Sequence, residues 1–388
     1  MIVPSVPIMK IAIIAEFPVG ALDGPMVGRG GGQAATWLPQ LAMAWQNQSE
    51  FEIHWCVLVH KVKIPRTIQK WGQTFHLIPS PGISASLLLG RWPQRLAYRK
   101  MFRKIKPDLI HCWGTENLHG AALLEFDGPS VLSMQGIIHT IYKIGDMKGW
   151  RWWLFKHWEL KSVRKADLIT CESNWGLERL EEIIPGKPQR RIEYGVNPSY
   201  YDIAWNPSSS APEILYAGGL SRAKGVDILL EMLKRHPKRT WKLVIAGGGY
   251  LEESLRALND PMVEVLGTIK TQELQARMAR AWALVHPSRA DTSPNVVKEA
   301  RVIGLPIVGS PHGGHAEYIE HGKDGFIVES EDPEDWFNAL ESICSNYALC
   351  RTMGQQRNEF FREHFRPKNT AEGFLKLYRE LLSPKPIF

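Results

Sequence analysis

Residues 286–328 read HPSRADTSPNVVKEARVIGLPIVGSPHGGHAEYIEHGKDGFIV, a stretch in which a helical pattern lies between two short apolar runs. The apolar spacing predicts a helix over 296–303, which Gly304 would end. Ser293 and Pro294 suit its N-cap and first helical position. The flanking runs, AWALVHPS and LPIVGS, read as buried strands. Strand, helix and strand in this order are typical of a parallel α/β domain.

Two carboxylates, Asp291 and Glu299, frame the start of this helix. A helix that begins past the carboxyl end of a parallel strand offers free N–H groups and the positive end of its dipole, which suit a phosphate. The two acids would then hold sugar hydroxyls nearby. We therefore expect a donor pocket here. The alternative is a capped helix on an ordinary α/β domain with scattered acids, which the order of signals over the whole stretch disfavours.

The pattern resembles the donor half of the retaining glycosyltransferases of family 4 (group 1), in which an acid, seven residues and a glutamate precede an alanine. Asp291, Glu299 and Ala300 fit it, with Asp where Glu is commoner. The resemblance implies the GT-B fold, an α/β architecture of two Rossmann-like domains with parallel sheets facing across a cleft. It also implies that Asp291 contacts the transferred hexose and that Glu299 binds the nucleotide ribose. The same resemblance places the distal phosphate on the backbone of Ser293, Pro294, Asn295, Val296 and Val297.

Length and composition fit two globular domains. The chain has 388 residues, is 44% apolar, and lacks an apolar run of the roughly 20 residues that a membrane span needs. Five cysteines without CxxC spacing fit reduced thiols. The N-terminal stretch lacks the basic and long apolar regions of a signal peptide, so we expect a cytoplasmic protein.

Alternating strand and helix patterns run through the chain and predict parallel sheets with helices on both faces. The polar segment NPSSSAP, 206–212, reads as a linker. We predict an acceptor-binding domain over 1–207, a nucleotide-sugar-binding domain over 208–369, and a C-terminal helix over 370–388 that crosses back to the first domain. The predicted strands are KIAIIAE, FEIHWCVLV, TFHLIP, DLIHCWG, PSVLSMQ, DLITCES and RRIEYGV, then EILYAGG, WKLVIAGGG, VEVLGT, ALVHPS, PIVGSP and GFIVES.

The net charge of +7 lies in the first half, where residues 1–207 hold 24 Lys and Arg against 17 Asp and Glu. Residues 91–106 carry seven bases and no acid, and residues 143–165 interleave bases with four tryptophans. Such a composition suits peripheral contact with an anionic membrane. The alternative is a solvated helix face above tryptophans that belong to the core. The sequence favours neither.

The segment LYAGGLSRAKG, 215–225, ends a strand and opens a helix with small residues and two bases, which suits a diphosphate. It is similar to the family's Gly-Arg-Leu-x-x-x-Lys-Gly, and the resemblance assigns Lys224 to the departing diphosphate. Gly219 stands where the family has an arginine, so Arg222 is the candidate substitute, with a surface position as its alternative. By the same resemblance, Gly248 borders the nucleotide and Thr268 lies where the base meets the backbone.

In the first half, Gly31 and Gly32 follow the first predicted strand, and the resemblance places them at the donor phosphates, with Gly32 also at the acceptor. A plain tight turn is the alternative. Gln135 stands where many relatives have a histidine. Its amide can bind a sugar hydroxyl but cannot act as a general base. Either His139, three residues on, takes over that role, or the leaving phosphate oxygen takes the acceptor proton in a front-face retaining transfer, and we expect the second. His139 is the other acceptor-side candidate, although a lone histidine is more often structural.

We therefore predict a retaining hexosyltransferase that moves a sugar from a nucleoside diphosphate sugar, its co-substrate, to a glycan or lipid-linked acceptor in envelope or exopolysaccharide assembly. No cofactor and no metal are expected, because the histidines lack a zinc-binding spacing. A non-catalytic relative that binds nucleotide sugar or membrane is the alternative. No nucleic-acid-binding motif accompanies the basic clusters, so nucleic acid is not an expected partner.

Overall fold

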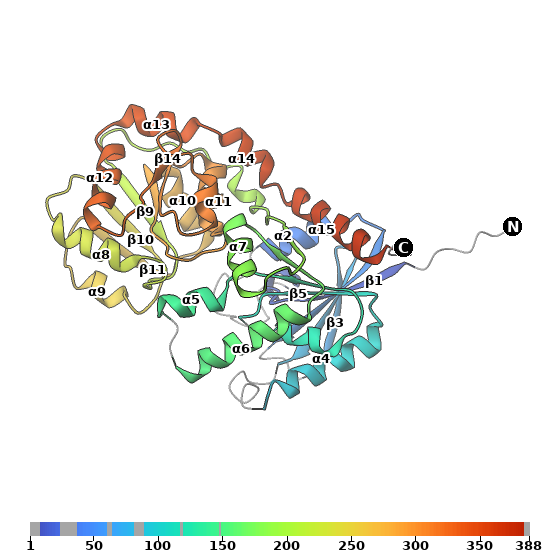
Figure 1. Cartoon of the computed structure of the whole chain (residues 1–388). Coiled ribbons are helices and arrows are strands. Elements are labelled where there is room, and N and C mark those ends of the chain that lie inside the picture. Colours follow the sequence, from blue (N-terminus) through green and yellow to red (C-terminus); the bar gives the residue numbers. More distant parts are fainter. Residues whose placement is uncertain are drawn as a thin grey trace.

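Two α/β units follow one another along the chain, each built around a mostly parallel sheet (Figure 1). The coordinates are a computed structural model that describes residues 8–23, 37–59, 64–80, 89–116, 119–146 and 149–383. We call the unit with the first sheet the N-lobe and the unit with the second sheet the C-lobe. The predicted α/β class with two sheets is confirmed. The division at residues 207 and 208 stays a prediction, although the strands before and after it belong to different sheets.

The N-lobe sheet has eight strands in the order β3-β4-β2-β1-β5-β6-β7-β8, and the C-lobe sheet has six in the order β11-β10-β9-β12-β13-β14. The N-lobe strands are β1 (Met9–Ile14), β2 (Phe51–Val59), β3 (Arg66–Lys70), β4 (Gln73–Pro79), β5 (Leu109–Trp113), β6 (Ser130–Ser133), β7 (Leu168–Cys171) and β8 (Gln189–Arg191). The C-lobe strands are β9 (Glu213–Ala217), β10 (Lys242–Ala246), β11 (Val263–Gly267), β12 (Ala283–His286), β13 (Ile307–Gly309) and β14 (Gly325–Ile327).

Helices cover both faces of each sheet (Figure 1). Those before the C-lobe sheet are α1 (Gly20–Asp23), α2 (Trp37–Ala44), α4 (Trp92–Ile105), the 3₁₀ helix η1 (His119–Glu125), α5 (Ile138–Ile144), α6 (Trp150–Lys165), α7 (Asn174–Ile183) and η2 (Pro198–Tyr200). Those after the first C-lobe strand are α8 (Val226–Arg235), α9 (Glu252–Arg256), α10 (Thr271–Arg280), α11 (Asn295–Ile303), η3 (Gly314–Tyr318), α12 (Pro333–Cys344), α13 (Tyr347–Gln355), α14 (Asn358–His364) and α15 (Pro367–Leu382).

Alternate residues of the central strands enter different cores, because successive side chains of a strand point to opposite faces of the sheet. In β1, Ile11 and Ile13 pack with α2 and α15, whereas Ala12 and Ile14 pack with α4, η1, α6 and α7. Both faces of the sheet are therefore buried. This explains why the strand reads as a continuous apolar run rather than as an alternating one.

The last helix, α15, packs on the N-lobe sheet although it follows the C-lobe in sequence (Figure 1). The indole N–H of Trp45 in the N-lobe donates to the carbonyl of Ala371 over 3.1 Å, and the Tyr378 hydroxyl lies 2.7 Å from His111 Nδ1. Phe374 meets Trp113 edge to face, with ring centroids 5.0 Å apart. The helix α15 thus completes the hydrophobic core of the N-lobe, although it follows the C-lobe in sequence.

The observed strands differ from the predicted ones in two places. Residues 66–70 form an edge strand, β3, which pairs antiparallel to β4 and was not predicted. β8 ends at Arg191, whereas a strand had been expected over 190–196. The chain leaves the sheet there because it bonds to the segment around α15 instead: Thr370 Oγ1 donates to the Glu193 carbonyl over 2.7 Å, and the Val196 N–H donates to the Phe365 carbonyl over 2.9 Å.

Replacement of Phe374 by alanine should lower the free energy of unfolding of the N-lobe by about 3–5 kcal/mol, because it empties a fully buried aromatic position between α15 and the sheet. Chemical unfolding followed by tryptophan fluorescence measures the effect. Lys376→Ala, at an exposed position of the same helix, is the control and should leave the midpoint nearly unchanged. Equal midpoints for the two variants would show that α15 does not hold the N-lobe together.

Candidate active site

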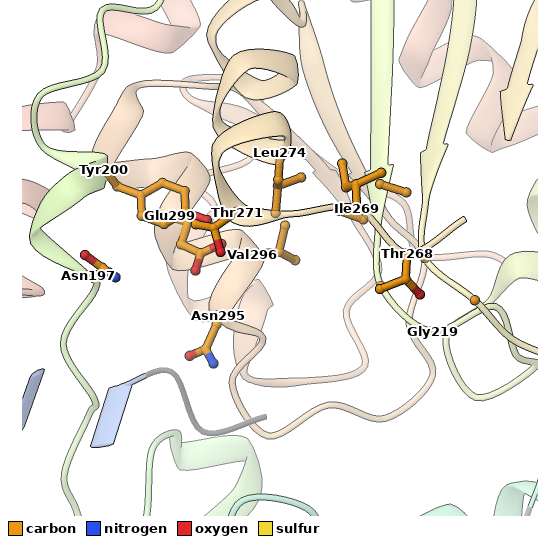
Figure 2. Close-up of a pocket in the computed structure, with 15 residues that line it drawn as sticks. Asn197, Tyr200, Gly219, Thr268, Ile269, Thr271, Leu274, Asn295, Val296 and Glu299 are labelled. Atoms are coloured by element: carbon orange, nitrogen blue, oxygen red, sulfur yellow. The ribbon is translucent and has the colours of Figure 1, made fainter. Parts of the chain in front are cut away.

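A cavity of about 430 Å³ lies where the chain leaves the carboxyl ends of β9, β10 and β11 (Figure 2). We call it the C-lobe cavity. It brings together six of the residues predicted to bind the donor: Gly219, Gly248, Thr268, Asn295, Val296 and Glu299. Asn197, Tyr200, Ile269, Thr271 and Leu274 complete the lining that Figure 2 labels. Its wall is mixed, because apolar side chains line it together with hydroxyl, amide and carboxyl groups.

Glu299 is the carboxyl group of this cavity, and Tyr200 lies beside it (Figure 2). Burial raises the pKa of Glu299 to about 7, and a hydrogen bond with Tyr200 partly offsets that rise. The residue therefore changes charge near neutrality. An ionised carboxylate accepts hydrogen bonds from two neighbouring hydroxyls, whereas the protonated form donates one of its own.

The first turn of α11 forms one wall of the cavity through Asn295 and Val296. The predicted cap was wrong by one residue, because Pro294 rather than Ser293 is the N-cap and Asn295 is the first helical residue. Ser293 is buried, and its hydroxyl lies 3.1 Å from the Tyr318 hydroxyl instead of bonding to the helix. Val297 is buried in the C-lobe core and does not reach the cavity. Gly304 ends the helix with φ 96°, as predicted.

A second pocket of about 210 Å³ lies between the lobes, and we call it the interlobe pocket. Lys224 and Asp291 line it from the C-lobe, and Gln135 lines it from the N-lobe, so all three residues predicted to be catalytic share one pocket. The Lys224 ammonium pairs directly with the Asp291 carboxylate. His286 Nε2 lies 3.7 Å from the same carboxylate.

The charges around Asp291 keep it ionised. Burial alone would favour the neutral acid, but the Lys224 ammonium and the His286 imidazole outweigh it and hold the pKa of Asp291 well below its ordinary value. Burial lowers the pKa of His286, so its imidazole is neutral at neutral pH. The pocket therefore offers one cation and one anion in direct contact, which a charged ligand would have to separate.

Contacts between the lobes fix the floor of the interlobe pocket. Thr292 donates its hydroxyl to the Gln135 carbonyl, and Ser173 donates to the Thr292 carbonyl over 2.5 Å. The loop that carries Lys224 is held from the N-lobe as well, because the Asp146 carboxylate accepts from the Ala223 N–H over 2.6 Å. These hydrogen bonds therefore fix the positions of the two lobes relative to each other at the pocket.

A buried ion pair lies beside these contacts. Lys298 of α11 and Glu172 of the N-lobe are 2.5 Å apart, with side chains 0% and 5% exposed. The Lys298 ammonium also donates to the Tyr194 carbonyl over 3.2 Å. Glu317 also joins the lobes: it accepts from the Trp175 N–H and pairs with Arg191, both over 2.9 Å.

Several predicted residues lie elsewhere. Arg222 is exposed and lines neither cavity, so the structure does not place it as a substitute for the missing arginine. A side chain at Gly219 would meet open space, so that the position of that arginine is left vacant. His139 does not line the interlobe pocket, because its Nδ1 and its backbone N–H both bond to Glu159, at 2.8 and 3.0 Å. Gly31 and Gly32 lie outside the described residues.

The structure adds residues that the sequence did not single out. Tyr200 lines the C-lobe cavity, and Glu116 and Trp175 line the interlobe pocket. Glu116 follows the carboxyl end of a predicted strand, which was the available signal for it, whereas Tyr200 and Trp175 carried none. Across the described segments, no group of three or more His, Cys, Asp or Glu side chains could hold a metal ion. Among the helices that the structure describes, none has the length and apolar character to cross a membrane.

Solved structures share the two-sheet fold over nearly the whole chain. The sucrose-phosphate synthase of Thermosynechococcus elongatus superposes with a TM-score of 0.78 at 20% identity, covering 96% of this chain and 99% of that one. Anabaena HepE, solved in complex with UDP-glucose, superposes with a TM-score of 0.70 at 16% identity, covering 96% and 100%. The two-sheet architecture is thus that of GT-B glycosyltransferases.

Sequence comparison reaches the family. The D-inositol 3-phosphate glycosyltransferase of Corynebacterium jeikeium is 31% identical over 180 residues, which is 43% of this chain and 43% of that protein. The chain thus matches less than half the length of that relative. The model of glycosyltransferase family 4 matches residues 36–200, and the model of group 1 glycosyl transferases matches residues 211–346. With one model on each lobe, the chain belongs to the group 1, family 4 glycosyltransferases.

Proposed function

We propose that this chain is a retaining glycosyltransferase that moves a hexose from a nucleoside diphosphate sugar to a glycan or lipid-linked acceptor. One observation carries the proposal: the segment around the start of α11 lines both cavities. Beyond this segment, Glu299 lines the C-lobe cavity, and the segment's Asp291 lines the interlobe pocket together with Lys224. A ligand with a sugar at each end of a diphosphate matches this sequence of groups. HepE, which has the same fold, was solved with UDP-glucose.

In this arrangement the nucleoside occupies the C-lobe cavity. The base lies near Thr268 and Ile269, and the ribose hydroxyls reach Glu299. The diphosphate faces the first turn of α11, where N–H groups without partners inside the helix and the positive end of the dipole favour an anion. The hexose then extends into the interlobe pocket towards Asp291.

Lys224 supplies the positive charge for the departing diphosphate. It is paired with Asp291, so the incoming phosphate takes over the ammonium while sugar hydroxyls take over the carboxylate. In a front-face retaining transfer, the bond between the anomeric carbon and the phosphate oxygen breaks as the bond to the acceptor oxygen forms, and the leaving phosphate oxygen takes the acceptor proton. This step needs no side-chain base, which fits Gln135 at the position where many relatives have a histidine. Transfer in envelope or exopolysaccharide assembly is our proposal for the pathway.

A thermal-shift screen with UDP, GDP, ADP and their glucose or mannose conjugates tests the donor class. A cognate ligand at a hundredfold excess over its Kd should stabilise the chain by about 2.7 kcal/mol. Release of nucleoside diphosphate from the stabilising conjugate then tests turnover. Stabilisation without release would favour a non-catalytic nucleotide-sugar-binding relative, and a flat screen would reject both.

Lys224→Ala should reduce turnover by about 10²-fold or more, because among the described residues that line the two cavities it is the cation that would stabilise the leaving diphosphate in the transition state. Nucleotide release under saturating donor measures the loss. Lys234→Ala, at an exposed lysine on α8, is the matched control and should turn over normally. Near-normal turnover of the Lys224 variant would reject this role for the residue.

Affinity for the sugar conjugate should increase as the pH rises from roughly 6 to roughly 8, since the pKa of Glu299 is raised to about 7 by burial and the ionised form accepts the ribose hydroxyls. Calorimetric titration at several pH values measures the dependence, and the conjugate has no phosphate that titrates in this range. Glu299→Gln should weaken binding and abolish the pH dependence. Glu253→Gln, at an exposed acid on α9, should retain it. An unchanged pH profile in the Glu299 variant would assign the titration to another group.

We also propose that the N-lobe contacts an anionic membrane through α4 and α6, which lie on the side of the sheet away from α15 (Figure 1). Trp92, Trp150 and Trp153 are 62%, 59% and 54% exposed. Part of the sequence cluster is core instead, because the buried Arg91 lies over the Trp158 ring at 5.0 Å. The exposed tryptophans, together with Lys161 and Arg164 on α6, remain available for lipid.

The double variant Trp150→Ala/Trp153→Ala should bind vesicles of phosphatidylglycerol and phosphatidylcholine at least about tenfold more weakly than the wild type, because apolar burial and charge both contribute to interfacial binding. Sedimentation with these vesicles, and with pure phosphatidylcholine, measures it. Phe360→Ala removes an aromatic side chain that is 53% exposed in the C-lobe and serves as the control. Equal binding of the wild type to anionic and neutral vesicles would show that the basic residues of α4 and α6 form an ordinary solvated face.

A further inference from the structure

Glu116 places a carboxyl group in the N-lobe wall of the interlobe pocket, across from Lys224 and Asp291. It lies just beyond the carboxyl end of β5. Its Oε2 accepts from the Thr115 N–H over 2.9 Å, and its Oε1 accepts from the Gly136 N–H over 2.6 Å. A carboxylate oxygen has two lone pairs, so each oxygen keeps acceptor capacity beyond these bonds.

Two glycines shape the niche that holds this carboxyl group. A Cβ atom at Gly114 would lie 2.7 Å from Glu116 Oε2, and one at Gly136 would lie 2.6 Å from Oε1. Gly114 also has φ 76°, a conformation that other residues rarely adopt. Any other residue at either position would push the carboxyl group out of place. The two glycines therefore leave the space that the Glu116 carboxyl group occupies, and the backbone N–H groups of Thr115 and Gly136 hold it there.

The other groups around Glu116 are those of a carbohydrate site. Trp175 contributes an aromatic ring, over which the Arg179 guanidinium lies at 5.8 Å, Thr140 a hydroxyl and Gln135 an amide, and all three residues line the same pocket. Sugars present apolar ring faces and directional hydroxyls, and aromatic rings with a few polar groups suit both. Gln135 Oε1 would lie 3.2 Å from a Cβ at Gly114, so the amide and the Glu116 carboxyl group border the same small space.

We propose that Glu116 binds a hydroxyl group of the acceptor sugar and orients that sugar on Trp175 for attack on the donor held by the C-lobe. The proposal rests on the proposed function and adds the residue that selects the acceptor. Glu116 accepts a hydrogen bond and exchanges no proton in the transfer, because the proton of the attacking hydroxyl goes to the leaving phosphate oxygen. A pyranoside with a free hydroxyl facing this carboxylate is the class of acceptor that fits.

Charges on the packed elements set the state of this carboxyl group. Burial raises the pKa of Glu116 to about 7, the N–H groups that bind it oppose this rise, and the buried Glu159 of α6 adds to it. Glu159 is in turn paired with His139 at 2.8 Å, and Lys224 and Asp291 face the pocket as a pair from the C-lobe. Ionisation on going through neutral pH turns Glu116 into an acceptor only, so acceptor binding should strengthen as the pH rises.

The test compares the wild type with Glu116→Gln, Trp175→Leu and, as the matched control, Glu178→Gln at an exposed acid on α7. Octyl glucosides, galactosides and mannosides serve as acceptor probes with the donor found in the thermal-shift screen. We expect the acceptor KM to rise roughly 10- to 100-fold in the Glu116 variant, as for the loss of a hydrogen bond to a charged group. In the Glu116 variant the acceptor KM should no longer depend on pH. Trp175→Leu should also raise the acceptor KM.

Release of nucleotide to water, without acceptor, should fall less than transfer does in both variants, because Lys224 and Asp291, which we propose hold the donor, line the pocket from the C-lobe, whereas Glu116 and Trp175 line it from the N-lobe. A parallel loss of hydrolysis and transfer would overturn the proposal by making the residues part of the donor site or of the fold. An unchanged acceptor KM in either variant would overturn it as well. If Glu116→Gln does not fold, Trp175→Leu still tests the proposal, because it leaves the residues around Glu116 unchanged.

If the wild type turns over no donor, the proposed function fails and Glu116 is judged by binding alone. Saturation-transfer NMR with methyl pyranosides needs no turnover. Signals present in the wild type and in Glu178→Gln but lost in Glu116→Gln would support a sugar site at this carboxylate. Equal signals in all three proteins, or none in any, would overturn it.

Discussion

The ion pair between Lys298 and Glu172 is the contact on which the geometry of the site depends. Both side chains are buried, and they join α11 of the C-lobe to the end of β7 in the N-lobe. Removing one partner of such a pair leaves an uncompensated charge and costs about 3–5 kcal/mol, whereas an apolar replacement of both partners is often neutral. The pair therefore specifies where the lobes meet more than it stabilises them.

Under the proposed function, its position explains how residues far apart in sequence would act on one ligand. Glu299 is the next residue along α11, so the ion pair fixes the direction from which its carboxyl group enters the C-lobe cavity. On the other side, Glu172 precedes Ser173, which bonds to Thr292, and Thr292 bonds to Gln135. The two cavities are thus set relative to one another by a continuous set of polar contacts. A shift of α11 by one turn would separate Lys298 from Glu172.

The strands, the helix α11 and its end at Gly304 could be predicted because each depends on local sequence: apolar runs, turn residues and a glycine with positive φ. What failed depends on partners elsewhere. β3 reads RTIQK, a polar edge strand with no apolar pattern to reveal it. His139 was open to a catalytic role until Glu159, 20 residues on, proved to hold it. The position of Glu116 after a predicted strand was a signal, but its contact with the Gly136 N–H, 20 residues on, required the structure.

Because Gly219 stands where the family has an arginine, Lys224 has two roles under the proposed function: it pairs with Asp291 and it binds the diphosphate. Among the described residues that line the two cavities, Lys224 is the positively charged one, and it is already bound to Asp291. A nucleoside diphosphate that takes the ammonium would leave the Asp291 carboxylate buried and unpaired, which is costly. An intact nucleotide sugar avoids that cost, because its sugar hydroxyls replace the ammonium at Asp291. Under the proposed function, the single cation thus makes the site bind the whole donor in preference to the released nucleotide, and product leaves as Lys224 returns to Asp291.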